Sequence, residues 1–246
     1  MNLLLVDPAE LAGDATCTLR DRRAVHLRTV LGAGVGAHVR AGVIGGGVGS
    51  AEILADDGAA ITLGLAITEP APAPLPIELV LAIPRPKVLT RVIEAAATFG
   101  VTRIELTNAW RVDKSYLRSP RLLPDALALA ARLGAEQGAT THLPAIAIHR
   151  RLMELLDARW PGPPAVKLVA HPGAPPIETA FPVGTGATAP LALAIGPEGG
   201  WIPREVETFV ARGFSPVSLG APILRVETAV AAALGQLLVL ARLRAG

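Results

Sequence analysis

Short runs of apolar residues, or of alternating apolar and polar residues, recur along the first 68 positions and are separated by glycines. Three of these runs cover residues 37–43, 49–54 and 60–67, and a spacing of about ten residues is typical of the strands of a small β-barrel. A glycine-rich stretch at 45–49 lies between two runs, and no helical pattern follows it. It therefore predicts a hairpin turn rather than a phosphate-binding loop.

The alternating pattern stops at residues 69–76, where four prolines occur within eight residues. Proline restricts the backbone to extended conformations and removes an N–H donor, so this segment predicts a stiff linker and forbids a helix or a central strand. The sequence thus divides into a barrel over 1–68, a linker over 69–76 and a larger unit over 77–246.

Strand-length apolar runs alternate with helical periodicity after the linker. The predicted strands are 77–83, 103–107, 165–170, 189–195 and 216–219, and the predicted helices are 87–99, 122–133, 203–212 and 227–243. Gly134 is expected near the end of the second helix. This alternation predicts an α/β fold with a parallel sheet covered on both faces.

The last predicted helix is apolar around almost its whole circumference, which indicates a helix buried on all sides. A subunit interface is one way to bury it. Its apolar run, 229–241, contains Gln236 and is too short to span a membrane.

Two of the predicted strands end abruptly in loops rich in glycine and proline, at 196–200 (GPEGG) and 218–224 (SLGAPIL). About twenty residues separate the loops, which suits parallel strands joined by one crossover helix, so both loops are expected at one edge of the sheet. A tight structural connection is the alternative for the first loop. The second loop argues for a ligand site, because Arg225, Glu227 and Thr228 crowd the start of the last helix, where free N–H groups favour a polar or anionic ligand.

Both loops resemble the ribosomal RNA small-subunit methyltransferase E family, knotted SPOUT enzymes that methylate N3 of a uridine in 16S rRNA using S-adenosylmethionine. The resemblance covers nearly the whole chain. It is carried by GPEGG at 196–200 and by LGxxILRVETA at 219–229, with weaker matches at 93–104 and at Glu136-Gln137. It implies a PUA-like RNA-binding barrel over 1–68 and a SPOUT domain over 77–246, with a C-terminal trefoil knot threaded around residues 195–235.

The resemblance also implies which residues form the site. The residues expected to bind S-adenosylmethionine are Val169, Ala170, His171, Ile195, Gly196, Pro197, Gly199, Gly200, Leu219, Gly220, Ile223, Leu224 and Thr228. The catalytic candidates are Arg225, Glu198 and Glu227. Uridine N3 must lose a proton, and Arg225 is expected to orient the base or stabilise its developing negative charge. The alternatives are an ion pair of Arg225 with either glutamate, a helix-capping role for Thr228 and a structural role for His171.

Composition and charge change this picture only in part. Hydrophobic residues make up 51% of the chain and aromatic residues 3%, so aliphatic packing must dominate the core. The single cysteine, Cys17, excludes an intramolecular disulfide and indicates a reducing cytoplasm. A net charge of +2 is weak for a nucleic-acid binder, so local clusters matter more. The predicted RNA contacts are Arg22, Arg23, His26, Arg28, Arg111 and Lys114, although a solvated charged face explains each cluster equally well.

Two segments depart from the family pattern: 107–116 replaces a Thr-x-Arg-Ser stretch, and 138–140 lacks an arginine. In the family both segments face the substrate, so they bear on the RNA target rather than on the methyl donor. Three functions remain open: the uridine-N3 methyltransferase, a methyltransferase with another RNA target, and a non-catalytic RNA-binding or ribosome-assembly protein. A nicotinamide-dependent oxidoreductase is excluded, because no GxGxxG follows the strand at 77–83. We expect a homodimer that uses neither a metal nor a membrane.

Overall fold

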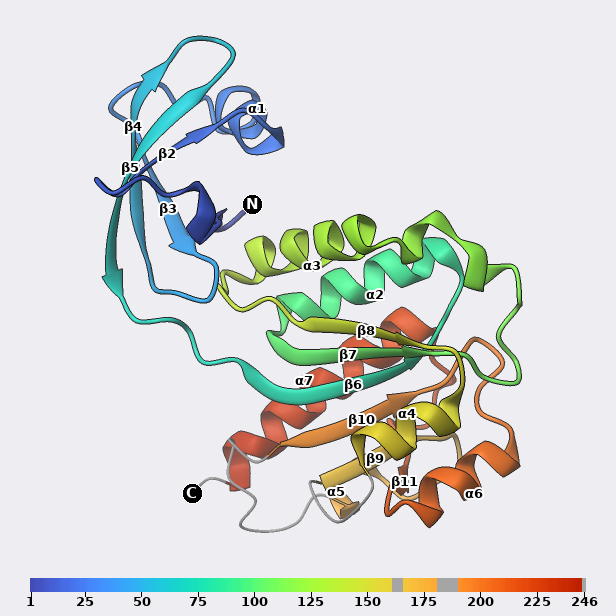
Figure 1. Cartoon of the computed structure of the whole chain (residues 1–246). Coiled ribbons are helices and arrows are strands. Elements are labelled where there is room, and N and C mark those ends of the chain that lie inside the picture. Colours follow the sequence, from blue (N-terminus) through green and yellow to red (C-terminus); the bar gives the residue numbers. More distant parts are fainter. Residues whose placement is uncertain (161–165, 181–189, 245–246) are drawn as a thin grey trace.

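Two β-sheets organise the chain: a mixed sheet built from the first 69 residues and a parallel sheet built from the rest (Figure 1). The computed structural model describes residues 1–160, 166–180 and 190–244. Ala165 and Ala189, the predicted first residues of two strands, lie outside the described residues.

The first sheet has the strand order β1-β3-β4-β5-β2, in which only the β1–β3 pair is parallel. Its elements are β1 (Leu4–Val6), the 3₁₀ helix η1 (Pro8–Glu10), β2 (Thr16–Leu19), α1 (Arg22–Thr29), β3 (His38–Val43), β4 (Val48–Asp56) and β5 (Ile61–Glu69). The three predicted strands and the hairpin are confirmed. The turn between β3 and β4 contains Gly45 at φ +71° and a hydrogen bond of 2.8 Å from Gly46 N to Val43 O.

The interior of this half combines aliphatic packing with one buried cation. Alternate side chains of the strands, among them Leu4, Leu19 and Ile53, pack together with Leu27 of α1. The Asp21 side chain accepts a hydrogen bond of 2.9 Å from Arg23 N and so caps α1. The Arg23 side chain is only 2% exposed, and its guanidinium is bound by Glu10, Asp21 and the carbonyl of Leu5.

The two sheets are joined by residues 70–74, which contain no regular element. Strand β6 (Leu75–Ala82) begins two residues earlier than predicted and includes Pro76, although it is a central strand. The pairing of β6 with β7 shifts its register between Leu75 and Glu78, so the missing N–H of Pro76 falls where the ladder is irregular. The expectation that the prolines forbid a central strand is therefore wrong for the last of them.

The second sheet is parallel throughout, with the order β11-β9-β10-β6-β7-β8. Its remaining elements are α2 (Pro86–Thr98), β7 (Val101–Thr107), η2 (Tyr116–Arg118), η3 (Pro120–Leu122), α3 (Pro124–Gly138), β8 (Ala145–His149), α4 (Leu152–Arg159), β9 (Val166–Ala170), α5 (Ile177–Ala180), β10 (Leu191–Ile195), α6 (Pro203–Ala211), β11 (Ser215–Val217) and α7 (Val226–Arg244). The helices lie on both faces of the sheet, as predicted (Figure 1).

Helix α3 continues past the predicted stop at Gly134 to Gly138, and Ala139 ends it in the left-handed conformation at φ +54°. Gly134 serves packing instead. A Cβ there would lie 2.1 Å from the carbonyl oxygen of Glu94 in α2, so only glycine allows the two helices to approach this closely.

Helix α7 is 19 residues long, and its window Val226–Leu243 is long and apolar enough to cross a membrane by length and composition alone. The prediction of too short an apolar run is thus wrong. Val230, Ala233 and Leu234 on one face of the helix are nevertheless fully buried in the core of the second half, although only 33% of this window is buried. The helix is not buried on all sides, because Val239 is 44% and Leu243 74% exposed.

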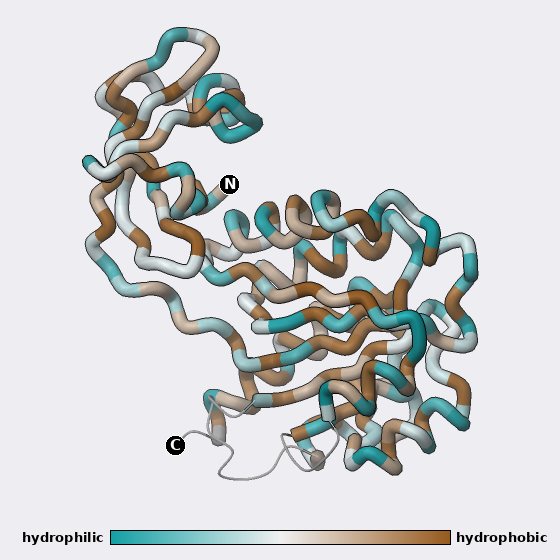
Figure 2. Tube along the Cα trace, viewed as in Figure 1, coloured by the Kyte–Doolittle hydropathy of each residue, from teal (hydrophilic) through white to brown (hydrophobic). Residues whose placement is uncertain are grey.

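The first sheet contacts the second half at the carboxyl end of α3. The amides of Asn2 and Leu3 donate to the carbonyl of Glu136 at 3.0 Å, and the two terminal guanidinium nitrogens of Arg22 donate to the Glu136 carboxylate at 2.7 and 2.9 Å. Brown apolar segments lie inside each half, while much of the exposed loops and helix faces is teal (Figure 2). The contact lies away from the carboxyl edge of the parallel sheet (Figure 1).

Candidate functional site

Three parallel strands end at one edge of the second sheet, and each is followed by a predicted ligand loop. Ile195 ends β10 before the GPEGG loop, Ala170 ends β9 before His171, and Val217 ends β11 before the second loop. The expectation that both loops lie on one edge is confirmed. Strand β9 pairs with both β10 and β11, so Val169, Ala170 and His171 lie between the two loops.

The GPEGG loop is a tight turn held by its own backbone. Gly200 N donates to Pro197 O at 2.7 Å, and Gly200 has a φ of +70°. A Cβ on Gly196 would approach Trp201 N to 3.0 Å, so a side chain there would displace the loop backbone. Glycine at these positions leaves backbone amides and carbonyls accessible to a ligand.

Neighbouring segments hold the loop from two sides. The carboxylate of Glu198 accepts a hydrogen bond of 2.9 Å from Arg85 N, which precedes α2. The guanidinium of Arg111 donates to the carbonyl of Gly199. Arg111, predicted as an RNA contact, therefore touches the loop itself, and Glu198 anchors the loop to the start of α2.

The second loop is fixed to α7 by a glutamine. Gln236 Nε2 donates to Leu219 O at 3.0 Å, and Ser218 Oγ hydrogen-bonds both the amide and the carbonyl of Gly220. Gly220 has a φ of +129°, which disfavours other residues. Beyond it, Leu224 is half-buried, whereas the side chain of Ile223 is 81% exposed.

Among the catalytic candidates, Arg225 is exposed and forms no ion pair within the described part of the chain. The alternative of a structural pair with Glu198 or Glu227 is therefore not realised. Glu227 is half-buried in the first turn of α7. Thr228 lies inside that turn rather than before it, so its capping role is wrong.

His171 is half-buried at the end of β9, and its backbone amide donates to Val217 O at 2.9 Å. Its Nδ1 atom is buried and has no hydrogen-bond partner among the residues described. A buried unpartnered ring nitrogen at the mouth of a ligand loop suits contact with a polar ligand group.

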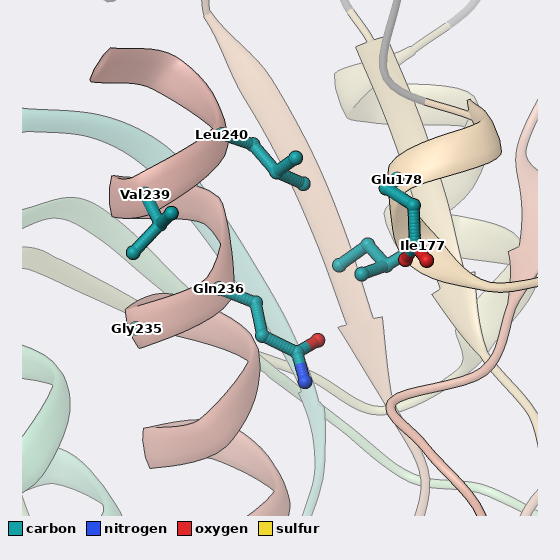
Figure 3. Close-up of a pocket in the computed structure, with 6 residues that line it drawn as sticks. All are labelled: Ile177, Glu178, Gly235, Gln236, Val239 and Leu240. Atoms are coloured by element: carbon teal, nitrogen blue, oxygen red, sulfur yellow. The ribbon is translucent and has the colours of Figure 1, made fainter. Parts of the chain in front are cut away.

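A shallow groove of about 420 Å³ lies between α7 and α5, beside the second loop. Its lining residues are Ile177, Glu178, Gly235, Gln236, Val239 and Leu240 (Figure 3). Gln236 binds the carbonyl of Leu219, while its Oε1 atom is buried without a partner in the described ranges.

The structure changes the list of predicted RNA contacts in the first half. Arg23 is removed from it, because its buried guanidinium requires both Glu10 and Asp21 as partners. Arg22 is bound to Glu136. Arg28 is bound to Asp56 at 2.6 Å and holds the pKa of that carboxyl below its usual value. His26 is half-buried on α1, and α1 lies away from the carboxyl edge of the parallel sheet (Figure 1).

Two residues at the edge were missed as site residues from the sequence. Gln236 is the only polar residue in the apolar run 229–241, and that was the available signal. Trp110 lies in the segment 107–116 and is 79% exposed. Lys114 of the same segment is exposed, with no ion pair in the described part of the chain.

Comparisons with known proteins agree with this architecture. Residues 71–238 match the model of the RNA methyltransferase domain family. The chain is 30% identical over 240 residues to the ribosomal RNA small subunit methyltransferase E of Treponema pallidum, covering 95% of this chain and 89% of that protein.

Two solved structures show the same fold. The ribosomal RNA small subunit methyltransferase E of Neisseria gonorrhoeae, bound to S-adenosylmethionine, has a TM-score of 0.77 at 23% identity and covers 98% of both chains. A Legionella pneumophila protein with bound S-adenosylmethionine has a TM-score of 0.76 at 23% identity and covers 97% of both chains. The fold, the two glycine loops and the near full-length match agree: the chain belongs to the ribosomal RNA small subunit methyltransferase E family of RNA methyltransferases.

Proposed function

We propose that this protein transfers a methyl group from S-adenosylmethionine to N3 of a uridine in 16S rRNA. The observation that carries the proposal is the meeting of the GPEGG loop and the second glycine loop at one edge of the sheet, with β9 between them. Membership of the family supports the RNA substrate, and the names of the relatives support the ribosomal target.

The residues present fit the cofactor. Backbone groups of the two loops are exposed by glycine, and the unpartnered polar atoms of His171 and Gln236 lie beside them. We assign cofactor binding to Val169, Ala170, His171, Ile195, Gly196, Pro197, Gly199, Gly200, Leu219, Gly220, Ile223, Leu224 and Thr228. S-adenosylmethionine, when bound, supplies the electrophilic methyl group.

The remaining site residues act on the acceptor base. Uridine N3 carries a proton at neutral pH, and its loss leaves negative charge on the ring. The exposed guanidinium of Arg225, which has no ion pair among the described residues, can stabilise that charge. Glu227, two residues further along the chain, is a candidate acceptor for the proton. Glu198 keeps the GPEGG loop against α2 through Arg85. Apart from this proton transfer, the roles are positioning and charge-stabilising ones, as displacement at a methyl group requires.

We infer further that residues 1–68 form the PUA-like RNA-binding unit and that 77–246 form the SPOUT unit, with a trefoil knot in the C-terminal segment. The two large aliphatic clusters, one for each sheet, support this division, and a small third cluster joins the halves where Leu3, Leu5 and Val48 contact Ala135 of α3. A cytoplasmic location and a homodimer complete the proposal. The single buried Cys17 suits a reducing compartment, and the exposed apolar side chains of α7 suit a subunit interface.

Calorimetry with S-adenosylmethionine tests the site through two matched glycines. Gly200 and Gly58 both have positive φ, +70° and +86°, and a Cβ on either meets no atom within 4 Å. Gly200→Val and Gly58→Val thus carry similar backbone strain, but only the first disturbs the GPEGG loop. We expect Gly200→Val to weaken binding at least about tenfold and Gly58→Val to leave it unchanged.

Methylation of 16S rRNA by the wild type, read out as N3-methyluridine by nucleoside mass spectrometry, tests the reaction itself. A folded wild type that binds RNA but not S-adenosylmethionine contradicts the enzyme proposal and leaves an RNA-binding scaffold. Binding lost equally in both glycine variants contradicts the assignment of the loop.

A further inference from the structure

One of the three tryptophans of this chain, Trp110, is exposed to solvent. Trp201 is 2% exposed, and Trp160 packs edge-on against Phe214 with 5.7 Å between ring centroids. Trp110, in contrast, is 79% exposed. In a chain with 3% aromatic residues, a nearly bare indole at the edge that carries the ligand loops is an unusual use of a large apolar surface.

The backbone beneath this indole is held on both sides. Val112 N donates to Ala109 O at 3.1 Å, which closes a turn, and Ala109 and Val112 are 8% and 7% exposed. Trp110 N donates to the Glu205 carboxylate at 2.8 Å, and Arg111 donates to Gly199 O. The turn therefore presents Trp110 from a fixed backbone directly beside the GPEGG loop, so docking a flat ligand on it costs little backbone entropy.

The charges around the turn are those of a surface for polyanions. Exposed cations without an ion pair in the described residues follow the turn in sequence or lie at the helix starts of the same sheet edge: Arg85, Lys87, Lys114, Arg118, Arg121 and Arg204. The carboxylates of the same segments, Asp113, Glu198 and Glu205, each accept a hydrogen bond from a backbone amide. Arg22, Arg23 and Arg28 of the first half, and Arg132 of α3, are in contrast paired with carboxylates. Unpaired cations around an exposed aromatic ring are the arrangement that binds single-stranded nucleic acid, through phosphates and base stacking.

We propose that Trp110 stacks on an unpaired RNA base next to the target nucleotide and so positions the substrate strand against the GPEGG loop. The inference rests on the proposed function and names the form of its substrate: a single-stranded segment rather than a duplex. Bases within a duplex are stacked on each other and offer no face to an indole. Trp110 is a positioning residue, since it touches the strand and not the reacting atoms.

Fluorescence titration with single-stranded oligouridylate tests the proposal. We expect the oligonucleotide to quench the tryptophan emission of the wild type but not the emission that Trp160 and Trp201 leave in Trp110→Phe, and a fully paired RNA duplex to leave the wild-type emission unchanged. Trp110→Ala weakens oligouridylate binding about 5- to 100-fold, whereas Trp110→Phe, which keeps an aromatic face, stays within about threefold of the wild type. For the titrations of these variants, fluorescence anisotropy of a labelled oligonucleotide replaces the tryptophan signal.

Lys114→Ala is the matched control on the same segment. It also weakens RNA binding, but it reduces the slope of log affinity against log salt by about one, because it removes a phosphate contact. Trp110→Ala leaves that slope unchanged, since stacking releases no counterions. A purely structural role of Trp110 does not produce this difference.

The proposal is overturned if Trp110→Ala binds oligouridylate as tightly as the wild type. It is also overturned if the substitution lowers the mass of the assembly and leaves RNA binding unchanged, because the indole then belongs to a contact between copies of the chain. Calorimetry with S-adenosylmethionine separates this result from the proposed function. If the folded wild type does not bind S-adenosylmethionine, the proposed methyl transfer is overturned. If the wild type binds the cofactor and Trp110→Ala keeps both the cofactor and the RNA affinity of the wild type, only the stacking role is overturned.

Discussion

At the scale of single residues, pairing divides the arginines of this chain into two groups. Arg22, Arg23 and Arg28 are paired with carboxylates and maintain the first half, whereas Arg225 is exposed and has no ion pair among the described residues. An arginine at the amino end of a helix is unfavourable for the helix dipole, so its presence there without a partner favours a ligand contact.

We expect Arg225→Ala to lower kcat of methyl transfer about 10²- to 10³-fold, the cost of losing one charge-stabilising donor. The Kd for S-adenosylmethionine stays unchanged, because the cofactor loops are intact. Arg242, exposed near the other end of the same helix, supplies the control Arg242→Ala, for which wild-type kcat is expected. Transfer of a radiolabelled methyl group to 16S rRNA measures both; equal rates for the two variants contradict the role of Arg225.

The ion pair between half-buried Glu10 and buried Arg23 predicts how stability depends on pH. The hydrogen bond from Arg23 lowers the pKa of Glu10 below its ordinary value of 4.5, despite the opposing effect of burial. The folded state therefore binds fewer protons than the unfolded state in this range, and stability is present above about pH 4.5 and lost as the pH falls through the lowered pKa. Urea unfolding between pH 7 and pH 3 should show a steeper loss of the free energy of unfolding for the wild type than for Glu10→Gln. If the free energy of unfolding falls equally with pH in the wild type and in Glu10→Gln, the stabilising role of the Glu10 carboxylate is contradicted.

At the scale of elements, the contact between α2 and α3 depends on a glycine in the middle of a helix. We expect Gly134→Ala to lower the free energy of unfolding by about 1–3 kcal/mol, because its Cβ would lie 2.1 Å from the Glu94 carbonyl oxygen and the helices must separate.

Gly235, in the middle of α7, is the matched control, since a Cβ there meets nothing within 4 Å. Gly235→Ala should be neutral or stabilise by up to about 1 kcal/mol through helix propensity. Chemical denaturation of both variants measures the difference, and a shift of the same sign in both argues against the packing explanation.

Helix α2 shows which elements the hydrophobic pattern predicts well. It has apolar positions at helical spacing and ends before Gly100, so the predicted helix 87–99 differs from it by one residue at each end. Strand β8 and helix α4 were not predicted. β8 is an edge strand of five residues with no fully buried side chain, and α4 has a weakly amphipathic pattern, so neither carries a strong local signal. The prediction that α3 ends near Gly134 is wrong, because a glycine in a sequence marks the end of a helix more often than a close contact between two helices.

At the scale of the whole molecule, α7 leaves apolar side chains uncovered next to the groove beside the second loop. Val239 is 44% exposed, and Val210 on α6 is 47% exposed. If α7 forms the proposed dimer interface, Val239→Asp converts an assembly of twice 25.3 kDa into a monomer, while Val210→Asp does not change the mass. Light scattering after gel filtration measures both masses. A wild type with the mass of one chain contradicts the dimer.

The sequence by itself determined the α/β class, the hairpin over 45–49 and the placing of both glycine loops at one sheet edge, because hydrophobic periodicity and glycine–proline punctuation are local properties. It also carried the family motif around Arg225. Only the tertiary structure decided that Arg23 is buried while Trp110 is exposed, that β9 lies between the two loops, and that Gln236 fixes Leu219. Burial and pairing are set by which distant segments meet, so the sequence alone could not show that Arg23 is a buried, ion-paired residue while Arg225 is exposed without an ion pair among the described residues.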